Sequence, residues 1–265
     1  MHLTPADVLH RLTDEIVTAL GDRLLGLYAY GSVVTGDFAP ERSDLDLLAV
    51  LRADPTASIL DVLAPLHQRV AEEHPEWAGR IEAEYLSVQA LTDFRTCPRP
   101  MVRISPGESL HLVAATRHYV LNWYTARLQG LPLWGPEPTA IIPEITQAEF
   151  RDVVIEHAAN WPKWVQDMRG PGPQAYAVLT LCRALHAVSE GRQASKKQSG
   201  AWALEVLLQW ADLIGWANQW WYAGGSDSDA SRLPEVTRFV QEVSARVCGG
   251  QFDRPGRHVE ARRAL

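Results

Sequence analysis

Hydrophobic residues follow a helical spacing at the start of the chain and then form two short runs. In residues 5–20 they recur every three or four positions, which predicts an amphipathic helix that begins after an N-cap and ends at a glycine. Residues 24–30 are an apolar and aromatic run, which is typical of a buried strand. Residues 44–50 form a second run of this kind, interrupted only by Asp44 and Asp46. The chain is therefore expected to begin with a helix and two strands.

Elements of both kinds continue as far as residue 136. Residues 57–73 have helical spacing, and residues 79–88 alternate between two faces, which predicts a third strand. Residues 91–109 contain several prolines and are expected to be irregular, whereas residues 111–128 are expected to form a helix. A short strand is expected at residues 131–136. This order of elements favours a mixed sheet flanked by helices.

From residue 146 onward the spacing is helical only. A capping-box sequence, Thr146-Gln-Ala-Glu149, opens the first helix of this part. The expected helices are residues 146–164, 174–190, 202–221 and 235–247. We therefore predict an α+β protein. Its mixed-sheet domain would span residues 1–140 and an all-α helical bundle residues 145–250, with a flexible tail at residues 251–265.

Composition and charge narrow the class of protein. The chain has 265 residues, of which 46% are hydrophobic, and its net charge is −7, with no long basic block. A nucleic-acid partner is therefore not expected. No apolar run is long enough for a membrane span, and no signal peptide is apparent. The three cysteines are far apart and odd in number, which favours a reducing compartment and no zinc site. We expect a cytoplasmic monomer.

The second strand carries the first candidate chemistry. Asp44 and Asp46 are two residues apart, so both side chains project from one face of the strand. Adjacent carboxylates repel, and a hard divalent cation such as Mg²⁺ relieves that repulsion. Gly31 and Ser32 end the preceding strand, where backbone N–H groups and a hydroxyl could hold phosphate oxygens. The alternative is a surface hairpin with two solvated aspartates, but the apolar flanks favour a buried site.

The third strand offers a further carboxylate. Glu82 and Glu84 share one face of this strand, and Ile81, Ala83 and Tyr85 occupy the other. An acid on this strand could complete a trio with the two aspartates. Solvated edge positions are the alternative for both glutamates, and the alternation alone does not choose between them.

Two motifs resemble those of a known family. Gly31-Ser32, followed by Ser43-Asp44-Leu45-Asp46, resembles the signature of the polymerase-β-like nucleotidyltransferases. The resemblance to the adenylyltransferases that modify streptomycin and spectinomycin extends further. It includes the Leu-x-Gly-Pro segment near residue 136 and the helix, glycine turn, lysine and Trp-Ala pattern of residues 177–203.

The resemblance implies an enzyme that transfers AMP from ATP to a hydroxyl of a small molecule, an aminoglycoside or aminocyclitol antibiotic, and releases pyrophosphate. It implies that Asp44, Asp46 and Glu82 hold one or two Mg²⁺ ions. Glu82, in the context Ile-Glu-Ala, would be the general base, and Glu84 is the alternative. An enzyme of this kind confers antibiotic resistance.

The same resemblance assigns binding roles in both domains. The residues implied to contact the nucleotide are Gly31, Ser32, Ser43 and Lys196, with the adjacent Lys197 as an alternative to Lys196. Trp164 matches a tryptophan that packs against the drug, and Trp161, its helical neighbour, is expected to bind the substrate with it. Because Lys196 belongs to the helical domain, we expect the active site to be completed at the domain interface.

The chain also departs from the family pattern. His118 occupies a position where the resembling enzymes carry an acid near the nucleotide. Arg169 and a Gly-Pro turn follow Trp164 where the streptomycin-modifying enzymes carry acids, which weakens the case for streptomycin as acceptor. Two other functions stay open: a nucleotidyltransferase that modifies a protein or another small molecule, and a non-catalytic module that binds nucleotide or antibiotic.

Overall fold

The computed structural model describes residues 3–250, which divide into two compact units. The first unit ends at Val153 and the second begins at Val154. The first unit therefore extends beyond residue 140, the expected end of the first domain, because Ile142 and Ile145 are buried in its core. The tail expected at residues 251–265 lies outside the described residues.

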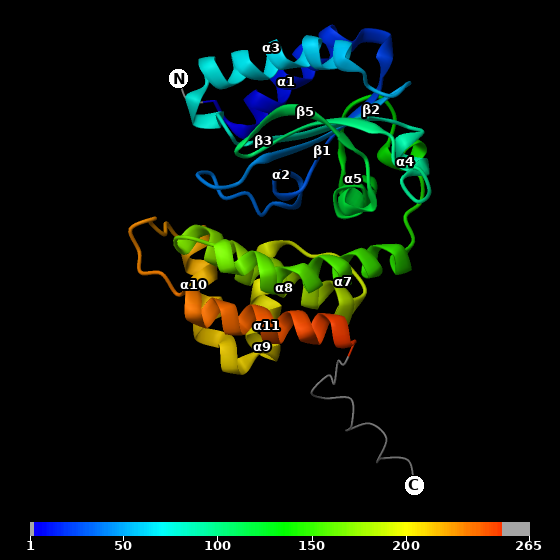
Figure 1. Cartoon of the computed structure of the whole chain (residues 1–265). Coiled ribbons are helices and arrows are strands. Elements are labelled where there is room, and N and C mark those ends of the chain that lie inside the picture. Colours follow the sequence, from blue (N-terminus) through cyan, green and yellow to red (C-terminus); the bar gives the residue numbers. More distant parts are fainter. Residues whose placement is uncertain (1–2, 251–265) are drawn as a thin grey trace. The chain divides into compact units, whose positions relative to one another are not determined.

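A six-stranded mixed sheet forms the centre of the first unit (Figure 1). Its strands, in the order in which they lie in the sheet, are β5 (Glu108–Ala114), β4 (Pro100–Ser105), β3 (Ile81–Ser87), β2 (Leu45–Leu51), β1 (Leu24–Tyr30) and β6 (Leu131–Trp134). β2 and β3 run parallel, and every other neighbouring pair is antiparallel. The three strands that were expected to carry the site, β1, β2 and β3, are thus neighbours.

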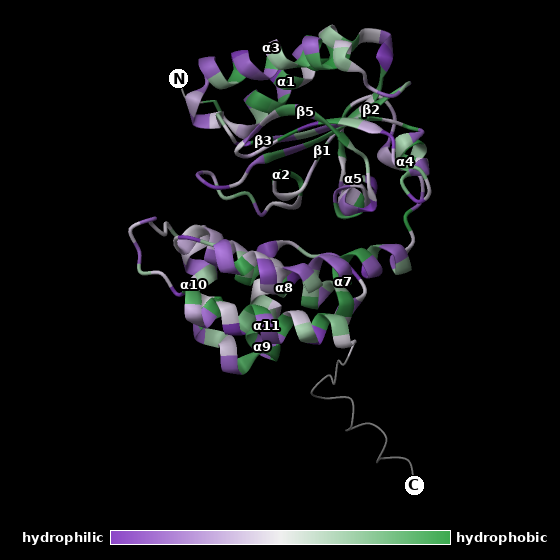
Figure 2. Cartoon of the chain, in the orientation of Figure 1, coloured by the Kyte–Doolittle hydropathy of each residue, from purple (hydrophilic) through white to green (hydrophobic). Residues whose placement is uncertain are grey.

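Helices cover both faces of this sheet (Figure 1). α1 (Pro5–Leu20) and α3 (Ala57–Glu73) pack on one face, and α5 (Val120–Gln129) packs on the other. α1 begins as predicted, because Thr4 Oγ1 accepts a hydrogen bond from the N–H of Asp7. Figure 2 shows hydrophilic and hydrophobic residues side by side on α3, as expected for a helix with one buried face.

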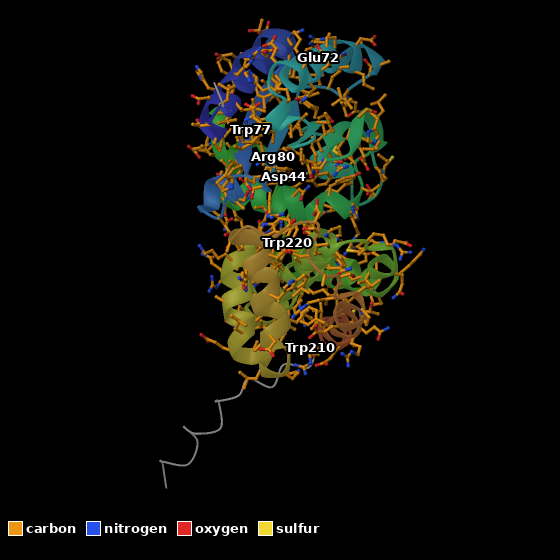
Figure 3. All side chains as sticks on the ribbon, turned by 90° about the vertical axis from the view of Figure 1, so that its left-hand side faces the viewer. Asp44, Glu72, Trp77, Arg80, Trp210 and Trp220 are labelled. Carbon is orange, nitrogen blue, oxygen red and sulfur yellow. The ribbon has the colours of Figure 1, made fainter. Side chains whose placement is uncertain are left out.

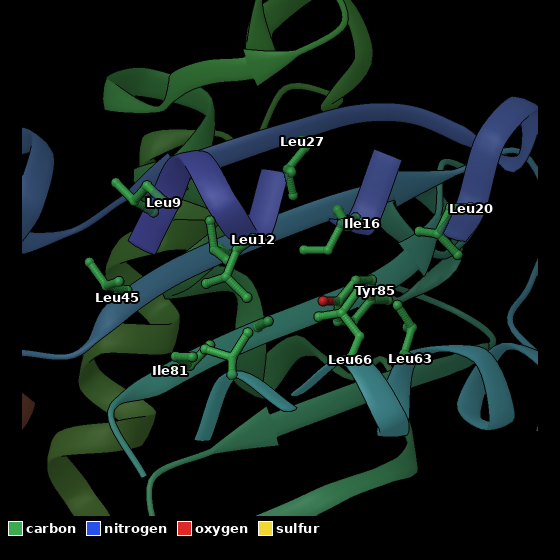
Figure 4. Packing of buried hydrophobic residues seen from close by; sticks show 14 of the residues in the cluster. Leu9, Leu12, Ile16, Leu20, Leu27, Leu45, Leu63, Leu66, Ile81 and Tyr85 are labelled. Atoms are coloured by element: carbon green, nitrogen blue, oxygen red, sulfur yellow. The ribbon is translucent and has the colours of Figure 1, made fainter. Parts of the chain in front are cut away.

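The core between α1, α3 and the sheet is formed by the faces of these elements that the sequence predicts to be apolar. Leu12 and Ile16 of α1 belong to the same buried cluster as Leu63 and Leu66 of α3, which lie beside Tyr85 of β3 (Figure 4). The opposite face of β3 is therefore left for its glutamates. The alternation in the sequence predicts this division of β3 into an apolar face and an acidic face.

The prediction for residues 91–128 was wrong in part. Residues 100–114 form the hairpin of β4 and β5 instead of an irregular segment and the start of a helix. Pro100 stands at the first position of β4, where a proline is tolerated, and Gly107 makes the turn with a φ of 81°. The helix expected from residue 111 consequently begins only at Val120.

The described part of the second unit is helical, as predicted. Its helices are α7 (Gln147–Trp164, which begins in the first unit), α8 (Pro171–Glu190), α9 (Lys196–Val206), α10 (Ala211–Tyr222) and α11 (Leu233–Gly249). α8 is buried along most of its length and packs against α9, α10 and α11. Among residues 3–250, no helix is long and apolar enough to span a membrane.

The helix boundaries of the second unit follow the prediction in part. The capping box of Thr146 and Glu149 forms as predicted at the start of α7. α8 begins three residues earlier than expected, because Pro171 occupies its first turn after Gly170, whose φ is 80°. The single helix expected at residues 202–221 is divided into α9 and α10.

Candidate active site

Three carboxylates meet where β1, β2 and β3 lie side by side. Asp46 of β2 is paired with Tyr30 of β1 on one side and with Glu82 of β3 on the other. Asp44 stands immediately before β2. One carboxylate oxygen from each of Asp44, Asp46 and Glu82 lies within 4.8 Å of the other two, and all three residues are partly buried. The predicted trio is thus brought together by adjacent strands.

Gly31 lies against one of these carboxylates. Its backbone has φ 72° and ψ −145°, a conformation that side-chain-bearing residues rarely adopt. A β-carbon placed there would lie 2.0 Å from Asp46 Oδ2. Ser32 follows as the first residue of the short helix α2 (Ser32–Thr35). Its hydroxyl is buried and, within residues 3–250, has no hydrogen-bond partner.

Ser43 shapes the loop that leads into β2. Its hydroxyl accepts a hydrogen bond of 2.9 Å from the N–H of Ala39, and its own N–H donates to the Ala39 carbonyl. The Arg80 guanidinium donates to the carbonyl oxygens of Pro40 and Ser43, and its positive charge interacts with Asp44; both residues are labelled in Figure 3. The loop bonds of Ser43 therefore fix the chain one residue before Asp44.

Glu82 is partly buried beside a positive charge. Arg103 Nη2 lies 3.2 Å from Glu82 Oε1, and Asn122 Nδ2 lies 3.3 Å from the same oxygen. Burial raises the pKa of the Glu82 carboxyl and Asp44 adds to the rise, while Arg103 opposes it. A carboxylate held in this way near two others can accept a proton or bind a cation.

Glu84, the alternative to Glu82, is in a different environment. It is 0% exposed and does not belong to the group of three carboxylates. Its two oxygens accept hydrogen bonds of 2.8 Å from Asn122 Nδ2 and from Trp123 Nε1. Burial raises the pKa of Glu84 to about 7, although these hydrogen bonds oppose the rise. This enclosed position leaves Glu84 no access to a substrate.

Two residues of this site, Tyr30 and Asn122, were not predicted from the sequence. Tyr30 has a buried hydroxyl without a hydrogen-bond partner in the described chain, and burial raises its pKa well above the ordinary value, with added effects of Glu84 and Asp46. Asn122, an amide among apolar residues of α5, contacts both glutamates. A single amide within an apolar stretch of a helix is the sequence feature that could have indicated a buried polar contact for Asn122.

The arginines before and at the start of β4 are in ion pairs. Arg95 pairs with Glu149, and Arg99 pairs with Asp54 and Asp93. These pairs tie the segment between α4 (Ala90–Asp93) and β4 to its neighbours. Arg103 of β4 also forms an ion pair, but its partner Glu82 belongs to the carboxylate trio.

The predicted residues of the second unit lie along one aromatic cluster. The rings of Trp161 and Trp164 are 5.6 Å apart, and Tyr176 lies 6.0 Å from Trp161. Lys196 Nζ lies 4.8 Å from the Tyr176 ring and 4.5 Å from the Trp221 ring. Lys197, in contrast, lies over Tyr222. Lys196 is thus the lysine that shares this cluster with the two tryptophans.

Comparisons with known proteins match both parts of the chain. Residues 13–97 match the model of the nucleotidyltransferase domain, and residues 140–246 match that of the aminoglycoside adenylyltransferase C-terminal domain. Aminoglycoside (3'') (9) adenylyltransferases of Klebsiella pneumoniae and Shigella flexneri are each 24% identical over 252 residues. The alignments cover 90% of this chain and 93% of each relative.

A solved structure shares the fold. The spectinomycin adenyltransferase AAD(9) from Enterococcus faecialis, determined with ATP and spectinomycin, matches with a TM-score of 0.76 and 18% sequence identity. The match covers 92% of this chain and 99% of that one. The likeness therefore extends over the sheet-containing unit and the helical unit alike.

Proposed function

The chain belongs to the aminoglycoside adenylyltransferase family, and from this premise we propose that it transfers AMP from ATP to a hydroxyl of an aminoglycoside or aminocyclitol antibiotic. The observation that carries the proposal is the trio Asp44, Asp46 and Glu82, assembled within a nucleotidyltransferase domain. Spectinomycin is the first acceptor to test, because the structural neighbour was determined with it. Location in the cytoplasm and a monomeric state stay predictions.

The trio fits a divalent metal ion. Each acid offers an oxygen within 4.8 Å of the others, and hard oxygen ligands are those that Mg²⁺ prefers. Asp44, Asp46 and Glu82 would hold one or two Mg²⁺ ions. When bound, these would supply charge neutralisation for the triphosphate and the leaving pyrophosphate. Partial burial of the acids supports this role, because their mutual repulsion costs more away from water.

Glu82 is proposed as the general base. As the acceptor oxygen forms its bond to the α-phosphorus, the hydroxyl proton passes to the Glu82 carboxylate and the bond to the β-phosphate oxygen breaks. The raised pKa of Glu82 increases its affinity for that proton. We prefer it to Glu84, whose oxygens are both engaged in the protein interior.

Four residues are proposed to bind the nucleotide. Gly31 would let the phosphates approach the backbone closely, and the buried Ser32 hydroxyl would donate to a phosphate oxygen. Ser43 would act through its hydroxyl proton, since its oxygen already accepts a bond from Ala39. Lys196 would neutralise charge on the leaving pyrophosphate.

The acceptor is proposed to pack on Trp164. A tryptophan face suits the C–H surface of a sugar or cyclitol and also attracts an amine. Trp161 is 3% exposed and donates through Nε1 to His157 Nδ1, so its role in substrate binding would be to hold the Trp164 ring, which lies 5.6 Å away. The departures at Arg169 and the following turn favour an acceptor with fewer positive charges than streptomycin.

Pyrophosphate release tests the proposal. The chain would be incubated with ATP and Mg²⁺ and with spectinomycin, streptomycin, other aminoglycosides or a lincosamide. We expect release with at least one aminoglycoside or aminocyclitol, and none from the Asp46→Asn variant. If none of these acceptors causes pyrophosphate release, a protein substrate or a binding function would be favoured instead.

A further inference from the structure

Asn122 connects the proposed base to a second, buried glutamate. Its Nδ2 atom lies 2.8 Å from Glu84 Oε1 and 3.3 Å from Glu82 Oε1. We infer that Asn122, held by Glu84, is a positioning residue that fixes the Glu82 carboxylate for metal binding and proton transfer. This inference rests on the proposed function of Glu82.

The orientation of the Asn122 amide is determined by its two acceptors. An amide nitrogen carries two protons, and each can point to one carboxylate. Turning the amide by 180° would place its oxygen against Glu82, which is paired with Arg103 and accepts but does not donate when ionised. The bond of 2.8 Å to Glu84 then holds the same amide nitrogen at Glu82.

Glu84 is itself immobilised. Its second oxygen accepts a hydrogen bond of 2.8 Å from Trp123 Nε1, and both Glu84 and Trp123 are 0% exposed. The Trp123 ring packs edge-on against Phe94 at a centroid distance of 5.2 Å. A buried carboxyl needs such donors, since an unpaired one would be costly. The chain of bonds from Trp123 through Glu84 to Asn122 is thus anchored in the core.

Glu82 is held through one of its two carboxylate oxygens. In the described chain, Arg103 Nη2 and Asn122 Nδ2 both donate to Oε1. Arg103 is held in turn by Glu108 and Ser105 at 3.0 and 2.9 Å. Donors from two elements, β4 and α5, limit rotation of the carboxylate and leave Oε2 available to the metal and the acceptor proton.

A purely structural role for Asn122 would be to attach α5 to the sheet. That attachment has another source, because Val120, Trp123 and Ala126 of α5 are buried in the core. Losing the Asn122 amide removes one donor from Glu84 and lowers stability, but it should leave α5 packed on the sheet while Glu82 loses a hydrogen bond. In a positioning role, a substitution lowers Mn²⁺ affinity and kcat. In a purely structural role, it lowers only the unfolding temperature.

The test compares Asn122→Leu with wild type and with Thr125→Val, a control on the same helix whose hydroxyl donates to the Leu121 carbonyl. Mn²⁺ affinity, kcat, KM and the unfolding temperature would be measured for each. We expect Asn122→Leu to weaken Mn²⁺ binding and to lower kcat, each by about 10- to 100-fold, with the acceptor KM unchanged. Thr125→Val should change neither kcat nor Mn²⁺ affinity.

Two further variants keep the test decisive. In a Glu82→Ala background, Asn122→Leu should have no additional effect on Mn²⁺ affinity. If Asn122→Leu does not fold, Asn122→Ala, which removes the same donors without adding bulk, should show the same loss of both quantities. Wild-type kcat and Mn²⁺ affinity in a folded Asn122 variant would overturn the inference. If wild type transfers AMP to no acceptor, the proposed function fails, while the Mn²⁺ affinities still test the positioning.

Discussion

Replacing Gly31 with alanine should damage catalysis far more than folding. A β-carbon at this position would lie 2.0 Å from Asp46 Oδ2, whereas carbon–oxygen contacts are ordinarily at least about 3.3 Å. Either the carboxylate or the backbone must therefore move by more than about 1 Å. Such a displacement of a catalytic group costs about 100-fold in rate. The positive φ of 72° adds strain of about 1–3 kcal/mol to the folded state.

Gly36→Ala provides the matched control. Gly36 also has a φ of 72° and ends the same short helix, but a β-carbon there would have no neighbour within 4 Å. Its substitution should cost about 1–2 kcal/mol of stability through the backbone alone. We therefore expect Gly36→Ala to keep the wild-type kcat and Mn²⁺ affinity.

The assay is urea unfolding combined with kcat and Mn²⁺ titration, for both glycine variants and wild type. We expect the larger loss of stability in Gly31→Ala, because its ψ of −145° lies near a region restricted to glycine, whereas the ψ of 19° at Gly36 is left-handed helical. We expect an approximately 100-fold lower kcat in Gly31→Ala only. If folded Gly31→Ala bound Mn²⁺ and turned over like wild type, the placement of Asp46 against Gly31 could not matter for the reaction.

Three other substitutions test separate parts of the account. Glu82→Ala should lower kcat by about 10²- to 10⁴-fold with little change in ATP affinity, and an unchanged kcat would exclude Glu82 as base. Lys196→Ala should weaken ATP binding more than Lys197→Ala does, as measured by calorimetry; the reverse order would reassign the role. The pKa of His67 is about 4 because burial disfavours its charged form, so the unfolded chain binds more protons below pH 6.5. From pH 7 to pH 5, the change in stability should therefore be about 2 kcal/mol less favourable in wild type than in His67→Gln, as measured by urea unfolding. The same pH dependence in both proteins would contradict this.

The sequence predicted the elements whose spacing has a single interpretation. The apolar run of β1, the Asp-x-Asp of β2 and the alternation of β3 were together enough to locate the candidate acids. Pairing in register brings Asp46 beside Glu82, which the sequence implied only through a family resemblance.

The hairpin of β4 and β5 was missed because its prolines suggested a loop. Pro100 stands at a strand end, where it breaks no ladder bond, and this cannot be read without the pairing partner. The different environments of Glu82 and Glu84 could not be predicted from the alternation of β3 either. Both face the same side of β3, and only the packing of α5 encloses one of them. Asn122 could be recognised only once that helix was placed.

The most direct test follows the phosphorus atoms of ATP. The chain would be incubated with Mg²⁺, spectinomycin and ATP labelled at either the α- or the γ-phosphorus. We expect the α label to appear on the antibiotic and the γ label in pyrophosphate, and Asp44→Asn and Asp46→Asn to abolish both. Label on the antibiotic from γ-labelled ATP, or transfer that persists without the two aspartates, would contradict AMP transfer at these carboxylates.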